Sequence, residues 1–382
     1  MNTTRRNIPE RHQGNIEIVE NLISPRFQEL GPKIQLPRIS RKVAERIAKN
    51  VEDGSYEFEK VECPVCFGTR FERLGEVDRY GLYTPISICV KCGLIQQNPR
   101  MTEQSLANFY ESDYRPLHDT TTVVGEQVRT NDHFSSRRLA ADRFRRSYSQ
   151  AAPIYKFIEN NIPIPMENLR ILDVGMGAGG TLKYFEERGH TVTGCDLGSE
   201  YVEYAREVHD LDGFVGTIDD LGVDISEFDL VLYIGVLEHI PNPVDQLSTL
   251  HSLVEDVFVY NTQWGLYAYE KYQMDILRKI QLAHIYYPSL RTMTNIFRSA
   301  GFSLVSGTED IHSIYHSVQE PGEYVSDYSH ALEFLNGLER RRFLYLNYYL
   351  QHPKLKTTLK RFGLLGFAEE SWSHLRQLRP RL

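Results

Sequence analysis

Hydrophobic residues follow two different patterns along the chain, and the change falls near residue 166. Before it, stretches such as RKVAERIAKNVED at 41–53 and MTEQSLANFYESDY at 101–114 favour amphipathic helices. After it, short apolar runs such as RILDVG at 170–175 and FDLVLYIG at 228–235 alternate with helical stretches. A short apolar run bounded by turn residues predicts a buried strand.

Strands and helices alternate from there to two closing strands, FSLVSGTED at 302–310 and HSIYHSV at 312–318. Strands that alternate with helices of this length imply a parallel sheet joined by right-handed crossovers. We therefore predict an α/β fold with a doubly wound, Rossmann-like sheet, preceded by a small module and by helices.

These patterns divide the chain into five expected segments. In order they are an N-terminal arm, partly helical (1–60), a cysteine-bearing module (61–100), a helical linker or lid (101–165), the sheet domain (166–320) and C-terminal helices with a basic end (321–382).

Composition narrows the class of protein without naming a function. The chain is 41% hydrophobic and 25% charged, with a net charge of −8, so no overall field attracts nucleic acid or anionic membrane. No apolar run approaches the roughly 18 residues that a membrane helix needs. The first residues lack the apolar core of a signal peptide, and we expect a cytoplasmic protein.

Four of the five cysteines form two C-x-x-C pairs, Cys63 with Cys66 and Cys89 with Cys92. Each such turn presents two thiolates to one ion, and two turns complete a tetrahedral set. In a reducing compartment this spacing indicates a metal site rather than disulfides. Four protein ligands leave zinc no open position, so we predict a structural zinc.

The stretch ILDVGMGAGG at 171–180 places a G-x-G-x-x-G pattern between a predicted strand and a predicted helix. Asp196 ends the next strand, where a carboxylate can accept both ribose hydroxyls. A nicotinamide and an adenosyl cofactor both fit these two features. Asp173 favours the second, because a carboxylate there would repel a pyrophosphate but suits the ammonium group of S-adenosylmethionine.

The motifs ILDVGMGAGG, VTGCDL, GTIDDL and FDLVLYIGVLEHIPNP occur in the order seen in class I S-adenosylmethionine-dependent methyltransferases. The chain resembles that family over about 165–320, and the resemblance implies a seven-stranded methyltransferase sheet. It also implies a set of residues that bind the cofactor. In this set, glycines approach the methionine part of the cofactor, an acid accepts hydrogen bonds from the ribose hydroxyls and three residues flank the adenine. That set is Gly175, Gly177, Gly179, Asp196, Leu197, Ile218 and Asp219, with Asp173 beside the ammonium. Thr217 stands where many members place an adenine-binding Asp; Asp219 could substitute for it.

Methyl transfer requires a positioned acceptor and, where the acceptor carries a proton, a base. His239 in LEHIPNP and His284 in HIYYPS are the candidate bases, because both flank the open end of the sheet. Tyr286 could orient an acceptor hydroxyl. Glu238 could pair with the substrate or orient His239.

The cysteine pairs together with CGLIQQNPR…FYESDYR resemble zinc-containing methyltransferases of bacterial sugar and cell-surface polysaccharide biosynthesis. This resemblance implies a nucleotide-sugar or glycan precursor as the acceptor. Those enzymes usually begin close to the first cysteine and carry a further C-terminal domain, whereas about 60 residues precede Cys63 here. C-methylation and O-methylation therefore both stay open, as does assembly into a homo-oligomer.

Two other functions remain in view. One is a non-catalytic protein that binds S-adenosylmethionine and docks onto a biosynthetic partner. The other is an RNA methyltransferase, which the acidic net charge disfavours. The chain also lacks the Pro-Cys nucleophile of cytosine-C5 enzymes, and its fourth strand is followed by VLEH rather than an Asn/Asp-Pro-Pro-aromatic motif.

Overall fold

The computed structural model describes most of the chain. The described residues are 10–12, 15–29, 31–118, 123–124, 127–128, 136–220, 225–254, 256–269, 271, 275–319 and 322–344. Among them, no helix is both long enough and apolar enough to cross a membrane.

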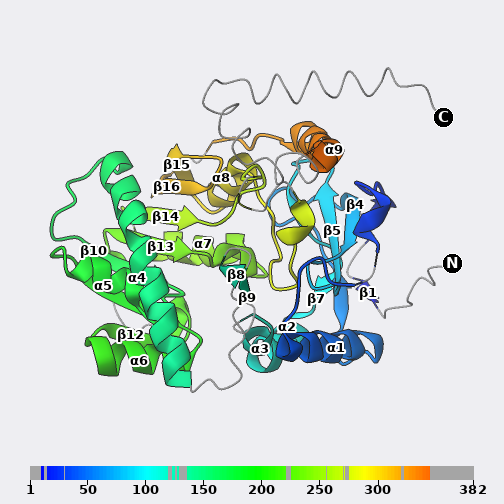
Figure 1. Cartoon of the computed structure of the whole chain (residues 1–382). Helices are drawn as coiled ribbons and strands as arrows, with labels where there is room; N and C mark the ends of the chain where they lie inside the picture. Colours follow the sequence, from blue (N-terminus) through cyan, green and yellow to red (C-terminus); the bar gives the residue numbers. More distant parts are fainter. Residues whose placement is uncertain are drawn as a thin grey trace.

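A seven-stranded sheet forms the centre of the sheet domain, as predicted (Figure 1). Its strands are β10 (Arg170–Val174), β11 (Thr191–Asp196), β12 (Asp212–Val215), β13 (Leu230–Ile234), β14 (Phe258–Thr262), β15 (Phe302–Gly307) and β16 (His312–Ser317). The spatial order is β12-β11-β10-β13-β14-β16-β15. Strands β10 to β14 run parallel, and β16 runs antiparallel to both of its neighbours.

Helices cover both faces of this sheet because successive apolar side chains of a strand point to opposite faces. One face packs against α4 (Ser136–Asn161), α5 (Gly180–Glu186) and α6 (Ser199–His209) through Ile171 and Leu232. The other packs against α7 (Pro243–Leu253) and α8 (Leu290–Ser299) through Leu172 and Val231. The strand order reverses between β10 and β13, so the carboxyl ends of these strands open the crevice where ligands bind in such folds.

The cysteine module is built on two small sheets. One contains β2 (Glu17–Glu20), β4 (Arg70–Val77), β5 (Tyr83–Cys89) and β6 (Ile95–Gln97); the other contains β1 (Glu10–His12), β3 (Phe58–Lys60) and β7 (Arg100–Met101). The N-terminal arm was expected to be extended and then helical, and α1 (Arg38–Glu52) is that helix. The extended part pairs with the module, since β1 joins β3 and β2 joins β4. Residues 1–9 lie outside the described part.

The C-terminal helix α9 (Tyr328–Leu344) packs on the module through Ala331, Leu335 and Leu338. The contact is close: a Cβ on Gly93 would lie 2.3 Å from the backbone nitrogen of Tyr328, so only glycine fits there. The rest of the expected C-terminal helices, 345–382 with the basic end, lies outside the described residues.

The predicted lid begins with α2 (Glu103–Phe109), continues in a π-helical turn, η2 (Tyr110–Tyr114), and ends in α3 (Arg115–His118). Such turns are rare and often mark functional sites. The remaining short elements are η1 (Pro25–Phe27), β8 (Val123–Val124), β9 (Gln127–Val128), η4 (Ile218–Asp220), η5 (Ile225–Glu227), η6 (Leu237–His239) and η7 (Ile276–Arg278).

Candidate functional site

The glycine loop follows β10 and has three glycines in the left-handed region, Gly175 (φ 77°), Gly177 (φ 56°) and Gly179 (φ 80°). A Cβ on Gly175 would lie 2.5 Å from Val236, and a Cβ on Gly179 would lie 2.6 Å from Leu211. A Cβ on Gly177 would have no atom of the described residues within 4 Å. The outer glycines thus permit close packing, whereas the middle one borders open space that a ligand can fill.

Asp196 connects this loop to the end of β11. One carboxylate oxygen accepts from the backbone nitrogen of Gly177 at 2.9 Å, and the other accepts from that of Gly198 at 2.7 Å. Burial raises the pKa of Asp196, and these two bonds act in the opposite direction. Each oxygen keeps a further lone pair, so the carboxylate can still accept from two hydroxyl groups.

Asp173 lies at the end of β10 and is only 2% exposed. Its Oδ1 has no hydrogen-bond partner. Burial, and next the nearby Asp196, raise the pKa of this carboxyl well above its usual range. A buried acid without a partner is costly and favours a cationic ligand beside it. An ammonium group fits this position, and a pyrophosphate does not.

The expected adenine side has an exposed apolar side chain and a buried one. Leu197 is 72% exposed, while Ile218 is buried. Thr217 supplies no carboxylate to this region. Its backbone nitrogen and its hydroxyl both donate to Asp220, at 2.8 and 2.9 Å. The side chain of Asp219 lies outside the described part of the structure.

Arg115 of α3 lies next to the expected adenine side. Its guanidinium forms an ion pair with Glu200 and lies 4.3 Å from the ring centre of Tyr201. A Cβ on Gly198 would collide with this guanidinium. The predicted lid segment therefore contacts the loop after Asp196, the acid that we predict to bind the ribose.

His239 has a defined tautomer. Its Nδ1 lies 2.9 Å from the carbonyl oxygen of Ala283, and a carbonyl only accepts, so Nδ1 carries the proton. The hydroxyl of Tyr110 lies 2.8 Å from the same nitrogen and donates to Ala283 at 3.3 Å. Burial lowers the pKa of His239 to about 4. The ring is therefore neutral near pH 7, and Nε2 keeps a lone pair that can accept a hydrogen bond or a proton.

His284 lies beside it, with ring centres 4.7 Å apart and planes at 81°. The amide oxygen of Gln281 accepts from Arg79 at 2.6 Å, so its amide nitrogen donates to Nε2 of His284. The proton of His284 is then on Nδ1. Burial lowers its pKa well below the usual range. The two neutral histidines thus offer one acceptor and one donor.

Glu238 completes this group. Ligand atoms of Glu238, His239 and His284 all lie within 4.8 Å of one another. The Glu238 side chain is buried, its Oε2 has no hydrogen-bond partner, and burial raises its pKa to about 7. Lys279 is also buried, which lowers its pKa to about 7, and it donates to the carbonyl of Trp264. These groups converge at the carboxyl ends of β13 and β14.

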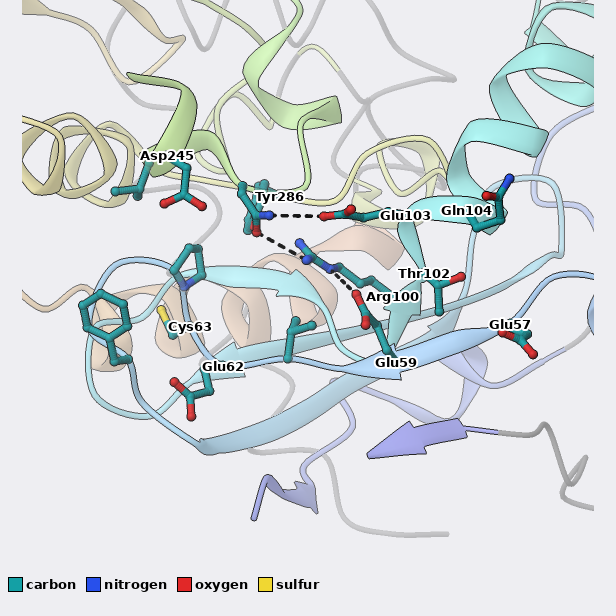
Figure 2. A pocket seen from close by; sticks show the side chains of 15 residues that line it. Glu57, Glu59, Glu62, Cys63, Arg100, Thr102, Glu103, Gln104, Asp245 and Tyr286 are labelled. Atoms are coloured by element: carbon teal, nitrogen blue, oxygen red, sulfur yellow. Dashed lines mark hydrogen bonds and ion pairs between the residues drawn. The ribbon is translucent and has the colours of Figure 1, made fainter. Parts of the chain in front are cut away.

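Tyr286 lies on the other side of this group. Its hydroxyl donates to the carbonyl of Pro241 at 2.7 Å. The residue lines a cavity of about 950 Å³ between the cysteine module and the start of α7 (Figure 2). That cavity is rich in carboxylates, and Arg100 approaches Glu59 to 3.5 Å there. Its polar lining residues include Glu57, Glu59, Glu62, Arg100, Glu103, Asn242 and Asp245.

The four cysteines of the two pairs converge as the sequence predicts. All four Sγ atoms lie within 4.8 Å of one another, with Cys63 to Cys92 at 3.4 Å and Cys66 to Cys89 at 3.5 Å. A tetrahedron of 2.3 Å zinc–sulfur bonds has edges of about 3.8 Å, so zinc fits with little adjustment. All four are buried.

Both turns have the same backbone form. Phe67 and Gly93 follow the second cysteine of each pair and have positive φ, 52° and 82°. The nitrogen of Phe67 donates to the carbonyl of Cys63, and that of Gly93 to the carbonyl of Cys89, each at 2.9 Å. The donor set of four thiolates leaves no open coordination position.

The module also supports the segment 279–288, which we call the histidine loop because it carries His284. The side-chain amide of Gln97 donates to the carbonyls of Leu282 (2.9 Å) and His284 (2.7 Å). Buried Asp78 accepts from the nitrogen of Leu282 at 3.1 Å. The module that carries the four cysteines thus contacts the loop of a candidate base.

Several residues of this site were not predicted from the sequence. Tyr110 and Arg115 belong to the quoted FYESDYR motif, but nothing local assigns them a role. The turn that carries them is anchored by buried Asp113, which accepts from Arg46 at 2.7 Å and from the Tyr56 hydroxyl at 2.5 Å. Asn261 and Gln263 were also missed, although they are polar residues at the end of the apolar strand β14 and just after it, which was the available signal. Lys279, which follows η7, was missed as well, and nothing local in the sequence marks it.

Comparison with known proteins agrees with the geometry of the glycine loop. Residues 138–307 match a family model described as a methyltransferase domain. A ubiquinone biosynthesis O-methyltransferase of Pseudomonas syringae pv. tomato is 34% identical over 93 residues, 22% of this chain and 40% of that protein. A mitochondrial one of Arabidopsis thaliana is 33% identical over 96 residues, 23% of this chain and 30% of that protein. The chain thus spans less than half the length of these relatives.

Solved structures are similar at lower identity. A S-adenosylmethionine-dependent methyltransferase from Aquifex aeolicus gives a TM-score of 0.37 at 15% identity, covering 48% of this chain and 97% of that one. Magnesium protoporphyrin IX methyltransferase from Synechocystis PCC 6803, with bound S-adenosylmethionine, gives 0.33 at 18%, covering 50% and 100%.

Proposed function

We propose that this chain, which carries a class I S-adenosylmethionine-dependent methyltransferase domain, transfers a methyl group to a small polar acceptor. One observation carries the proposal. Asp173, a buried acid whose Oδ1 has no partner, and Asp196, a carboxylate with free lone pairs, lie on either side of an open glycine loop. This arrangement suits an ammonium group and a ribose in the same ligand.

When bound, S-adenosylmethionine supplies the methyl group from a positively charged sulfonium. Asp173 would hold its ammonium, Asp196 its ribose hydroxyls and Leu197 its adenine. The chain's task at the acceptor is to orient the attacking atom and to remove its proton. Nε2 of His239 would accept that proton, since its lone pair is free and its ring is neutral. Tyr110 and Ala283 would keep the ring in that tautomer.

The four cysteines would hold one zinc ion with a structural role. The module that they close contacts the histidine loop through Gln97 and Asp78. We therefore assign zinc an indirect role in activity, through the position of His284.

For the acceptor, we propose a nucleotide-linked sugar or glycan precursor, methylated on carbon or oxygen. The resemblance of the cysteine pairs and of CGLIQQNPR…FYESDYR to sugar methyltransferases supports this proposal. The matched relatives are ubiquinone biosynthesis O-methyltransferases over a partial region, which is compatible with a small acceptor.

The test is transfer of a 13C-labelled methyl group from S-adenosylmethionine into a cell extract, followed by NMR and mass spectrometry. Label in a sugar-nucleotide or glycan fraction supports the proposal, and the carbon shift separates O-methyl from C-methyl. Label in RNA would overturn the acceptor class. Binding without any transfer would indicate a non-catalytic docking protein.

A further inference from the structure

Two buried amide side chains at the end of β14 have no partners. Asn261 is 0% exposed and Gln263 is 7% exposed, and neither the nitrogen nor the oxygen of either amide makes a hydrogen bond. Native proteins leave few buried polar atoms unpaired, and a bound water, a bound ion or a catalytic role usually explains the exceptions. Four such atoms on two residues of one strand end therefore require an explanation.

Their position places them beside the proposed acceptor site. Asn261 lies in β14, and Gln263 is the first residue after it, where its backbone nitrogen still donates to the carbonyl of Ile311 at 3.3 Å. Because side chains i and i+2 of an extended chain point the same way, we expect both amides on one side of the sheet. Asn261 pairs with Tyr233 of β13, and the nitrogen of Gly235 donates to the carbonyl of Thr262 at 2.8 Å. The amides thus adjoin the turn that leads from β13 to Glu238 and His239.

Charged groups border the same edge. A Cβ on Gly235 would lie 3.8 Å from Oε1 of Glu238, and Oε2 of that carboxylate has no partner. Lys279 donates to the carbonyl of Trp264, the residue after Gln263. The carboxyl ends of β13 and β14 therefore bring two neutral amides close to the acidic side chain of Glu238 and the amine of Lys279.

We infer that Asn261 and Gln263 bind the acceptor and select one with adjacent hydroxyl groups. The inference rests on the proposed function. Each amide offers two N–H donors and a carbonyl acceptor, and each hydroxyl both donates and accepts. A hydrocarbon would leave the amides unpaired, and a phosphate could not use the amide oxygens and would face Glu238. A site built to bind hydroxyls rejects analogues that lack them.

The experiment replaces each amide by an apolar side chain of similar shape, Asn261→Leu and Gln263→Met. The matched control is Thr84→Val, because Thr84 on β5 also has a buried hydroxyl oxygen without a partner. Each protein is assayed for unfolding temperature, for S-adenosylhomocysteine affinity and for 13C-methyl transfer into the small-molecule fraction of a cell extract.

We expect all three variants to fold with unchanged or higher unfolding temperatures, because an unpaired buried polar group is lost. S-adenosylhomocysteine affinity should be unchanged. The initial rate of methyl transfer should fall roughly 10- to 100-fold in the two amide variants and stay at the wild-type level in Thr84→Val. Wild-type transfer in Asn261→Leu and Gln263→Met would overturn the inference while leaving the proposed function intact.

If the wild-type protein transfers no label, the proposed function fails separately, and binding then tests the inference. The same proteins are titrated with catechol and with UDP-glucose, two probes with adjacent hydroxyls, in the presence of S-adenosylhomocysteine. The inference is supported if the wild-type protein binds either probe and both amide variants do not. Absence of binding to wild type, or binding that the variants keep, overturns it.

Discussion

The hydroxyl of Tyr110 lies 2.8 Å from Nδ1 of His239, although 129 residues separate them in the chain. The contact joins the π-helical turn of the lid to the candidate base at the carboxyl end of β13. Asp113 in the same turn is held by Arg46 of α1 and by Tyr56. The N-terminal helix thereby helps to position the tyrosine that orients the proposed base.

Removal of the Tyr110 hydroxyl should slow turnover without weakening cofactor binding. A hydrogen bond contributes about 1 kcal/mol, so Tyr110→Phe should lower kcat roughly 3- to 10-fold with S-adenosylhomocysteine affinity unchanged. Tyr260→Phe is the matched control, since its hydroxyl also lies 2.7 Å from a histidine nitrogen, that of His312 on β16. Equal loss in the two variants would refute a special role for Tyr110.

The middle glycine of the loop should be required for the ligand rather than for packing. Gly177→Ala and Gly189→Ala both place an L-residue at positive φ, with no atom within 4 Å of the new Cβ. Each should destabilise the fold by about 1 to 2 kcal/mol. Only Gly177→Ala should weaken S-adenosylmethionine binding, because its Cβ enters the proposed cofactor space; calorimetric titration checks this. Equal affinities would place the cofactor elsewhere.

The cysteine cluster should hold one zinc ion per chain. Cys63→Ser should reduce the metal content measured by mass spectrometry, lower the unfolding temperature and reduce turnover, because the module holds the histidine loop. Cys195→Ala should leave the zinc content unchanged, since Cys195 lies outside the cluster. Metal-free protein with unaltered stability would show that the thiols serve another purpose.

His239 should make stability depend on pH in one direction. Its pKa is about 4 in the folded chain and 6.5 ordinarily, so between these values the unfolded chain binds a proton that the folded chain does not. Stability from this residue is therefore lost as pH falls through that window. Chemical unfolding of wild type and His239→Asn should show a difference that shrinks by about 1.4 kcal/mol per pH unit there. Between pH 7 and 8 the difference should be flat, and a rise on acidification would contradict the assignment.

The sheet and the cysteine site were predictable because their signals are local. A short apolar run predicts a strand wherever it packs, and two C-x-x-C turns specify four ligands by spacing alone. The strands of the N-terminal arm were missed because β1 pairs with β3, some 48 residues later (Glu10 with Phe58), and no local pattern encodes that partner.

Several residues of the candidate site were likewise missed because their contacts join parts of the chain that are far apart in sequence. Tyr110 is one of 23 tyrosines, and only its contact with His239 distinguishes it. Asn261 and Gln263 became candidates because their amides are buried and unpaired, which depends on the packed structure. From the sequence, both His239 and His284 were expected at the open end of the sheet, with Glu238 beside His239; their convergence within 4.8 Å required the fold.

The most direct test of the account is a calorimetric titration of the wild-type protein with S-adenosylmethionine and, separately, with NADH. We expect one S-adenosylmethionine site per chain, which S-adenosylhomocysteine competes for and Asp196→Asn weakens, and no binding of NADH. Binding of NADH at the glycine loop, or no binding of S-adenosylmethionine, would contradict the assignment of the loop to a methyl donor.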